Sequence, residues 1–323
     1  MKVLLISENA PSIYGGIERH CHNIKLLFNN DKDITVESIS KEDIGFYKIN
    51  VIDKIVFNEK KLRQRIYISK CDVVHIHGFA SLAVWQAIRI ASKLKKRIIY
   101  TAHFHPFERL DNPTLGKLFF HFLLKPYIKK IDTIITINKE DTAFFKKYHN
   151  NTIMIPNWLA KPIIENNNSK KKNIILFVGR NDHNKSPQYL NDLPSKYEIH
   201  CVTNTSKNLR NDFIFHTQIS DNELNELYRQ ASLLIVPSRY EAFSYVVLEA
   251  LAQGTPALIS DNVRIADYIG QKQGVTIFKY GDHNDFLNKI ETAIQQKVDI
   301  NFIKALFSET TIKKQLTSIY LRK

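Results

Sequence analysis

Short apolar runs rich in β-branched residues recur along the chain and alternate with longer segments of helical period. The runs are KVLLIS, DVVHIHG, RIIYTAH, DTIITIN, NIILFVGR, YEIHCVTN, SLLIVPS and TPALIS. Several are continuously apolar, as strands buried on both faces of a parallel sheet are. Segments of helical period lie between them, at residues 18–28, 80–94, 221–230 and 286–295. This alternation predicts doubly wound parallel α/β sheets.

The alternation breaks at AKPIIENNNSKKKN, residues 160–173, which contains Pro, three consecutive Asn and a Lys run without periodicity. Such a composition is typical of a linker. A chain of 323 residues is also about twice the length of a typical domain. We therefore predict a Rossmann-like domain over residues 1–160, a second over 161–306, and a final helix over 307–323.

The amino-terminal segment MKVLLISENAPS has an apolar run long enough for a strand and too short for a signal-peptide core or a membrane span. The three cysteines, Cys21, Cys71 and Cys201, have no metal-ligand or disulfide-framework spacing. These features predict a cytoplasmic protein, or one that is peripheral on the inner face of the cell membrane.

The net charge of +14, from 46 basic and 32 acidic residues, changes this picture. Residues 1–160 hold 25 basic and 15 acidic side chains, a net of +10, so most of the excess lies in the first half. The positive electrostatic field that this excess creates favours anionic partners, namely acidic lipid, phosphorylated ligands or nucleic acid. The plain alternative is a solvated basic surface. No nucleic-acid module is found, so we expect no nucleic-acid partner.

One segment of the basic half, LGKLFFHFLLKPYIKKID at residues 115–132, alternates Phe and Leu with Lys and His. It is compatible with an anionic membrane interface. It is equally compatible with an ordinary helix that buries its apolar face and extends its lysines into solvent.

The stretch VPSRYEAFSYVVLEALAQGTPALIS carries two carboxylates, Glu241 and Glu249, eight positions apart. A strand, a loop and a helix are predicted here, with Ser244 as the helix N-cap and Gly254 beyond the helix end. A helix N-terminus after a parallel strand is an anion site. Phosphate flanked by carboxylates that accept hydroxyl hydrogen bonds suggests a nucleotide sugar, whereas the alternative is two ordinary surface charges.

Four segments together resemble a known family. PSRYEAFSYVVLEALAQGTPAL resembles the E-x7-E signature of retaining glycosyltransferases with the GT-B fold, in the family-four group of phosphatidylinositol mannosyltransferases and lipopolysaccharide core glucosyltransferases. YGGIERHCHNI is similar to its Gly-Gly turn and first helix, YTAHFHPF to its T-x-H strand end, and FVGRNDHNKS to its donor-phosphate loop. The similarity covers about residues 1–260. Ser244 and Ser186 stand where the family often has Gly.

The resemblance implies an α/β protein of GT-B architecture, with two Rossmann-like domains facing a central cleft. The first domain would bind the acceptor, the second would bind the nucleotide-sugar donor, and the last helix would cross back to the first. Arg180 and Lys185 would neutralise the diphosphate as it leaves, Glu241 would hold the sugar and Glu249 the ribose. The donor-binding residues expected are Gly15, Gly16, Arg180, Lys185, Glu241, Ala242, Phe243, Ser244, Tyr245, Val246 and Glu249.

The histidines in HIH (His75, His77) and HFH (His103, His105) raise the question of a metal, because alternate residues project from one strand face. No Asp or Cys completes a plain ligand set, and enzymes of the resembled family generally work without metal. We therefore expect no metal and no cofactor. Instead, we expect strand-end histidines facing the cleft, with His103 catalytic and close to the transferred sugar.

The sequence thus predicts a retaining hexosyltransferase that moves a sugar from a nucleotide-diphosphate sugar to a saccharide or lipid-linked glycan, in cell-surface polysaccharide, lipopolysaccharide or glycolipid synthesis. Two alternatives stay open: another GT-B enzyme such as a nucleotide-sugar 2-epimerase, and a non-catalytic anion-binding protein.

Overall fold

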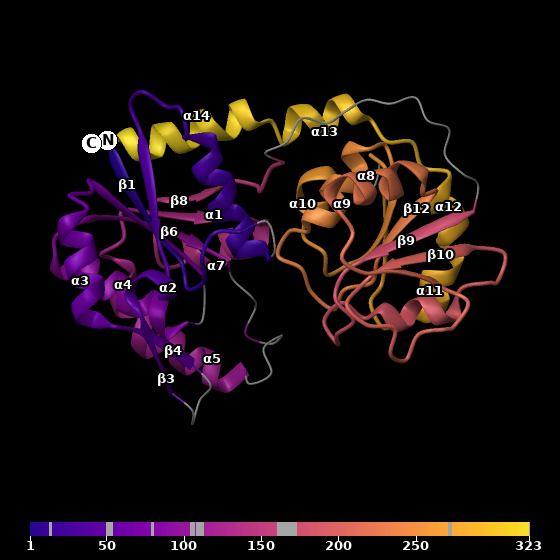
Figure 1. Ribbon diagram of the computed structural model, residues 1–323, viewed down its shortest axis with the longest axis horizontal. Coiled ribbons are helices and arrows are strands. Elements are labelled where there is room, and N and C mark those ends of the chain that lie inside the picture. The colour runs from indigo at the N-terminus through magenta and orange to yellow at the C-terminus, as the bar shows by residue number, and fades with distance from the viewer. Residues whose placement is uncertain are drawn as a thin grey trace. The chain divides into compact units, whose positions relative to one another are not determined.

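The protein is described here from a computed structural model that covers residues 1–12, 15–49, 54–78, 81–103, 107, 113–159, 173–270 and 273–322, without the side chains of residues 115 and 119. The chain forms two compact units, Met1–Ala160 with Glu309–Lys323, and Lys161–Ser308 (Figure 1). Except for residue 173, the predicted linker lies outside the described residues. Both units are α/β, which confirms the predicted fold class.

The first unit is built on a parallel sheet with strand order β2-β1-β5-β6-β7-β8. The strands are β1 (Lys2–Ile6), β2 (Thr35–Ile39), β5 (Val73–His77), β6 (Arg97–Ala102), β7 (Thr133–Thr136) and β8 (Thr152–Met154). The antiparallel pair β3 (Phe46–Ile49) and β4 (Lys54–Phe57) stands outside this sheet. The order reverses between β1 and β5, as in doubly wound folds.

Alternate residues of these strands enter two different hydrophobic cores. On one face, Leu4 and Val74 pack in a core with residues of α3 (Glu59–Ile68), α4 (Leu82–Lys93) and α7 (Lys139–Lys146). On the other face, Val3 and Val73 pack in a core with residues of α1 (Gly16–Leu27) and α14 (Glu309–Leu321). The sheet is therefore covered on both faces, which explains its continuously apolar strands.

The remaining helices of the first unit are short. They are α2 (Lys41–Ile44), α5 (Pro113–Phe119), the π-helix Phe120–Leu124 and α6 (Lys125–Ile128). The last three elements form the segment whose Phe and Leu alternate with basic residues. Phe120, Leu124 and Ile128 are buried in the core, whereas Leu118 and Phe122 are exposed.

The second unit repeats the plan with strand order β11-β10-β9-β12-β13-β14, again parallel. Its strands are β9 (Ile174–Val178), β10 (Glu198–Val202), β11 (Ile214–His216), β12 (Leu233–Val236), β13 (Ala257–Ser260) and β14 (Val275–Phe278). Its helices are the 3-10 helix Pro187–Asp192, α8 (Asp221–Gln230), α9 (Tyr245–Ala252), α10 (Ala266–Ile269), α11 (His283–Asn288), α12 (Ile290–Ile294) and α13 (Ile300–Leu306).

Two helix boundaries differ from the sequence prediction. The single helix expected at 286–295 is two helices that meet at Lys289, and the first begins earlier because the Asp282 side chain caps it by accepting from the Asp285 N–H. The final helix begins at Glu309 rather than at residue 307, because Phe307 packs against Phe243 and Tyr268 in the second unit, with ring centroids 5.6 and 5.9 Å away.

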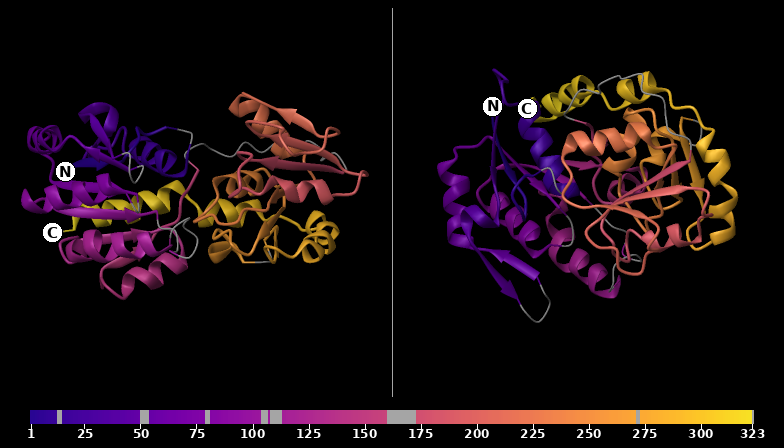
Figure 2. Two further views of the ribbon diagram at one scale, coloured as in Figure 1. Left: turned by 90° about the horizontal axis from the view of Figure 1, so that it is seen from below. Right: turned by 45° about the vertical axis from the view of Figure 1, so that its right-hand side comes forward.

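Helix α14 belongs to the first unit although it follows the second in sequence, and both views of Figure 2 show this yellow helix beside the first unit. Ile312, Leu316, Ile319 and Tyr320 enter its core. Arg97 of β6 donates hydrogen bonds to the carbonyls of Ile319 and Tyr320. Apolar burial and charge-assisted hydrogen bonds thus both hold α14 in place.

Two serines occupy backbone conformations that favour glycine. Ser186 has φ 50° and ψ 48°, and Ser244 has φ 112° and ψ 98°. These are the two positions where the resembled family often has Gly, so the family's preference has a conformational reason. Ser244 stands at the N-cap of α9, but within the described part of the chain its hydroxyl makes no cap hydrogen bond to the helix. The predicted N-cap position is therefore confirmed, but the side chain does not cap the helix, because this backbone conformation differs from the extended one of an ordinary N-cap.

We expect Ser244→Gly to stabilise the second unit by about 1 kcal/mol, because relief of roughly 1–3 kcal/mol of backbone strain exceeds the entropy cost of a glycine. Ser244→Ala is the matched control, since it removes the same hydroxyl and keeps the Cβ. Urea unfolding followed by circular dichroism measures both. An equal or lower stability of the glycine variant would show that the conformation is not strained.

Candidate functional site

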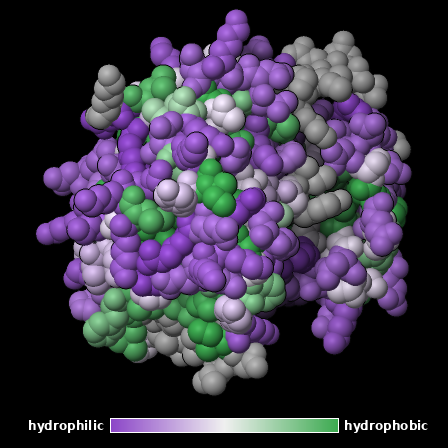
Figure 3. Space-filling model, turned by 60° about the vertical axis from the view of Figure 1, so that its left-hand side comes forward, coloured by the Kyte–Doolittle hydropathy of each residue, from purple (hydrophilic) through white to green (hydrophobic). Residues whose placement is uncertain are grey.

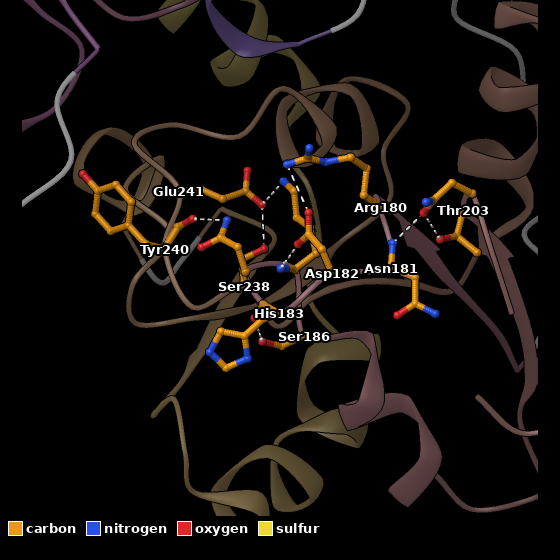
Figure 4. A network of polar contacts seen from close by, with 12 residues as sticks. Arg180, Asn181, Asp182, His183, Ser186, Thr203, Ser238, Tyr240 and Glu241 are labelled. Carbon is orange, nitrogen blue, oxygen red and sulfur yellow. Dashed lines mark hydrogen bonds and ion pairs between the residues drawn. The ribbon is translucent and has the colours of Figure 1, made fainter. Parts of the chain in front are cut away.

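The loop that follows β9 carries the two predicted phosphate-binding cations. It runs from Gly179 to Ser186 at the carboxyl end of the strand, where parallel α/β sheets bind ligands. Asp182 organises it: one carboxylate oxygen accepts the Lys185 backbone N–H at 2.9 Å, and the other lies 3.1 Å from Nη2 of Arg180 (Figure 4). The Arg180 side chain is 74% exposed, so its guanidinium is accessible to a ligand.

Lys185 and Glu241 form an ion pair that joins this loop to the loop after β12. Lys185 Nζ lies 2.8 Å from Glu241 Oε1, and the Ser238 hydroxyl donates to the same oxygen at 2.7 Å. The two charged side chains are only 21% and 11% exposed. A buried pair of this kind is strongly coupled, since removal of one partner leaves the other charge uncompensated.

The pKa of Glu241 reflects this balance. Burial raises the pKa of the carboxyl, but the charge of Lys185 and the hydrogen bonds from Lys185 and Ser238 lower it by more, so the pKa of Glu241 lies below its ordinary value. Glu241 is therefore ionised near neutral pH and acts as a hydrogen-bond acceptor, not as an acid.

Backbone hydrogen bonds fix the position of Glu241. Its N–H donates to the Asn262 carbonyl at 3.1 Å, and its carbonyl accepts from the Arg264 N–H at 3.0 Å. The Asn184 side chain donates to the Tyr240 carbonyl at 3.1 Å. The three loops after β9, β12 and β13 are thus tied together around one carboxylate.

The second acid, Glu249, lies just over one turn into α9 and accepts a hydrogen bond from the Tyr228 hydroxyl at 2.9 Å. Between the two acids, Ala242 and Val246 are partly buried, whereas Phe243, Ser244 and Tyr245 are buried. The Phe243 ring packs among other aromatic rings of the second unit. Its side chain therefore supports the loop, and a donor would meet the backbone here.

A cavity of about 340 Å³ adjoins the loop after β9, lined by Asn181, Asp182, His183, Gln188, Asn208 and Leu209. Its lining is mostly polar. It shares Asp182 with the network that positions Lys185 and Arg180.

The predicted Gly-Gly turn lies in the first unit, at the start of α1. Gly15 has φ 82°, and a Cβ there would stand 2.2 Å from Glu18 Oε2. Glu18 in turn accepts a hydrogen bond from the Asn9 side chain at 2.7 Å. Gly15 is thus required by the turn itself, while a Cβ at Gly16 would meet nothing within 4 Å.

The histidines of the first unit are more deeply buried than the sequence suggested. His75 and His77 have no exposed surface, which corrects the expectation that they face an open cleft. The reason is their position on the sheet face covered by α1 and α14. His103 is 8% exposed, and His105 lies outside the described residues.

His77 and His103 lie beside His20 of α1, which the sequence did not single out. The ring centroid of His20 lies 5.4 Å from that of His77 and 5.1 Å from that of His103. Burial lowers the pKa of His20 to about 4, although the hydrogen bond that His20 donates to Asn157 opposes this, and burial lowers the pKa of His77 well below its usual range. Both imidazoles are therefore neutral near neutral pH.

The structure thus brings together Arg180, Lys185, Glu241 and the start of α9 within the second unit, and places Gly15, Gly16 and His103 in the first. Sequence reasoning missed Ser238, Tyr228 and His20. Ser238 stands three residues before Glu241, a spacing that would have indicated a local hydrogen bond. Tyr228 and His20 gave no such signal, because their partners come from other elements.

Comparisons with known proteins agree with this arrangement. The model for Glycosyltransferase Family 4 matches residues 14–159, and the model for Glycosyl transferases group 1 matches residues 161–305. The O-antigen chain mannosyltransferase RfbU of Salmonella typhimurium is 26% identical, over 55% of this chain and 60% of its own.

Solved structures show the same fold. Sucrose-phosphate synthase from Thermosynechococcus elongatus superposes with a TM-score of 0.74 at 17% identity, over 99% of this chain and 98% of its own. Anabaena HepE, in complex with UDP and glucose, superposes with a TM-score of 0.66 at 12% identity, over 99% of each chain. Because one family model covers each unit and the matched structures share the whole architecture, the chain belongs to the family-four type of GT-B glycosyltransferases.

Proposed function

We propose that the protein is a retaining hexosyltransferase that uses a nucleotide-diphosphate sugar as donor. The observation that carries the proposal is the Lys185–Glu241 pair, with Arg180 and the start of α9 beside it. The cations and the helix N–H groups suit a diphosphate. The carboxylate between them suits sugar hydroxyls, and Anabaena HepE binds UDP and glucose on the same fold.

In the proposed reaction, these residues mainly stabilise the charge that develops on the leaving group. As the bond between the sugar and the diphosphate breaks, Arg180, Lys185 and the N–H groups of α9 stabilise the negative charge on the leaving phosphate. Glu241 accepts hydrogen bonds from the sugar hydroxyls and holds the ring. The acceptor hydroxyl then attacks from the face that the diphosphate leaves, and its proton passes to the departing phosphate oxygen. This sequence of steps retains the configuration and needs no metal.

The first unit would supply the acceptor side. His103 is its candidate contact to the transferred sugar, and the Gly15–Gly16 turn offers backbone that a ligand can approach closely. The acceptor class is proposed from two observations: the excess positive charge of residues 1–160, and the similarity to an O-antigen mannosyltransferase. A saccharide or lipid-linked glycan of cell-surface polysaccharide synthesis fits both.

The same unit offers a surface for anionic lipid. Leu118 and Phe122 are 48% and 66% exposed, and Lys125, Lys129 and Lys130 follow them at exposed positions. Figure 3 shows hydrophobic side chains gathered along the lower edge of one face. None of the described helices is both long and apolar enough to cross a bilayer. We therefore propose peripheral attachment through this segment.

Donor binding separates the proposed function from its alternatives. We expect one class of nucleotide-diphosphate sugar to raise the melting temperature, and sugar transfer to a glycan acceptor to follow.

Arg180→Ala should lower kcat/KM by about 10- to 100-fold, which corresponds to the loss of one charged hydrogen bond. It should leave the melting temperature unchanged, because the side chain is exposed. Lys196→Ala, at an exposed and likewise ion-paired cation elsewhere in the second unit, is the control. Isomerisation of the donor sugar without an acceptor would indicate an epimerase, and stabilisation by no donor would overturn the proposal.

The two acids should differ kinetically. Glu241→Gln should depress kcat by about 10- to 100-fold, because its hydrogen bonds to the sugar persist in the transition state. Glu249→Gln should act mainly on KM, because the ribose is remote from the reacting bond. Steady-state kinetics at pH 7, with a thermal melt of each variant, tests this. Equal kcat losses would contradict this division of roles. If both variants lost only stability and bound the donor normally, the pair would be structural.

Membrane attachment predicts binding to vesicles that contain phosphatidylserine and none to phosphatidylcholine vesicles, with a loss at high salt. Phe122→Ser and Lys129→Glu should each weaken binding several-fold in a sedimentation assay. Phe302→Ser, at an exposed aromatic of the second unit, should not. Equal binding to both vesicle types would argue against an electrostatic surface.

A further inference from the structure

Three buried histidines of the first unit converge from separate elements. His20 lies in α1, His77 ends β5 and His103 follows β6. One ring nitrogen from each lies within 4.8 Å of the other two. Three atoms at that separation or less lie within about 2.8 Å of a common centre, by the geometry of an equilateral triangle, whereas zinc binds imidazole nitrogen at about 2.0–2.1 Å. Shifts of under about 1 Å would therefore complete a coordination site.

His77 shows that this is more than a packed cluster of rings. It has no exposed surface, and within the described part of the chain neither of its ring nitrogens has a hydrogen-bond partner. A buried imidazole without partners is costly. His75, two residues earlier on the same strand face, bonds Tyr320 and Thr101 through its two nitrogens, at 2.8 and 2.7 Å. The fold therefore satisfies one buried histidine of this strand and leaves the other available to a ligand.

His20 has the second contact that metal-binding histidines commonly make. Its Nδ1 lies 2.7 Å from Oδ1 of Asn157, a buried residue. An amide oxygen only accepts, so Nδ1 carries the proton and Nε2 presents a lone pair. A hydrogen bond of this kind fixes the tautomer and the ring orientation of a ligating histidine. Trp158 packs against the edge of the same ring, with centroids 5.3 Å apart.

We propose that His20, His77 and His103 bind one divalent transition-metal ion through neutral imidazole nitrogens, with zinc as the best-matched ion. Three nitrogen ligands suit zinc and its neighbours in the first transition row. The fourth position of the tetrahedron stays open to water. The ion would tie α1 to the ends of β5 and β6. The site lies wholly in the first unit and does not involve the Lys185–Glu241 pair, but it shares His103 with the proposed contact to the transferred sugar.

Titration of chelator-treated full-length protein with Co²⁺ and then Zn²⁺ tests the site. We expect one Co²⁺ per chain with the visible absorption of a tetrahedral complex, its displacement by Zn²⁺, and a higher melting temperature with metal. His77→Gln should abolish the spectrum. Asn157→Ala, which keeps all three ligands, should weaken affinity about 10- to 100-fold, as loss of an orienting partner does.

His121→Gln is the matched control, because His121 is an exposed histidine of the same unit. It should bind like the wild type. The absence of stoichiometric binding by the wild type would overturn the proposal. So would unchanged binding in His77→Gln, or an equal loss in His121→Gln. Should His77→Gln fail to fold, Asn157→Ala decides, since undiminished affinity in that variant contradicts the site.

Discussion

A parallel sheet must be covered on both faces, and in this protein that constraint also determines where the chemistry lies. Covering helices alternate with strands, so every strand of a sheet ends at the same edge. In the second unit the loops that leave β9, β12 and β13 meet there around Glu241. In the first, β5 ends at His77 and β6 is followed by His103, beneath α1. The parallel strand arrangement thus brings residues that are distant in sequence to the same edge of each sheet.

The Lys185–Glu241 pair makes the proposed donor site depend on charge balance. Each ion is mostly buried and compensates the other, so a ligand that withdraws Lys185 toward phosphate must give Glu241 other hydrogen-bond donors. Sugar hydroxyls supply such donors without adding charge. A phosphate that carries no sugar would pair with Lys185 but would offer no hydrogen-bond donors to Glu241, so the carboxylate would lose a charged partner without replacement. Under the proposed function, the same geometry would favour an intact nucleotide sugar over its separated parts.

Local patterns in the sequence were sufficient for most of the fold. All eight apolar runs are strands, and the loop that carries Arg180 and Lys185 follows β9 as the pattern indicated. Edge strands such as β11, with three residues, carry too little pattern to be predicted. The meeting of α11 and α12 at Lys289 has no Gly or Pro signal. The contacts of His20 with His77 and of Tyr228 with Glu249 depend on tertiary packing, which no spacing along one element reveals.

Helix α14 makes the first unit discontinuous in sequence, with the whole second unit inserted before its last element. During synthesis, the sheet face that carries Val3, Leu5 and Val73 lacks the cover of α14 until residues 309–322 have left the ribosome. The hydrogen bond between His75 and the Tyr320 hydroxyl likewise cannot form until α14 has been synthesised. The domain made first is therefore completed last. Its nascent apolar face is the part of this chain that most needs protection from aggregation while the second unit is being translated.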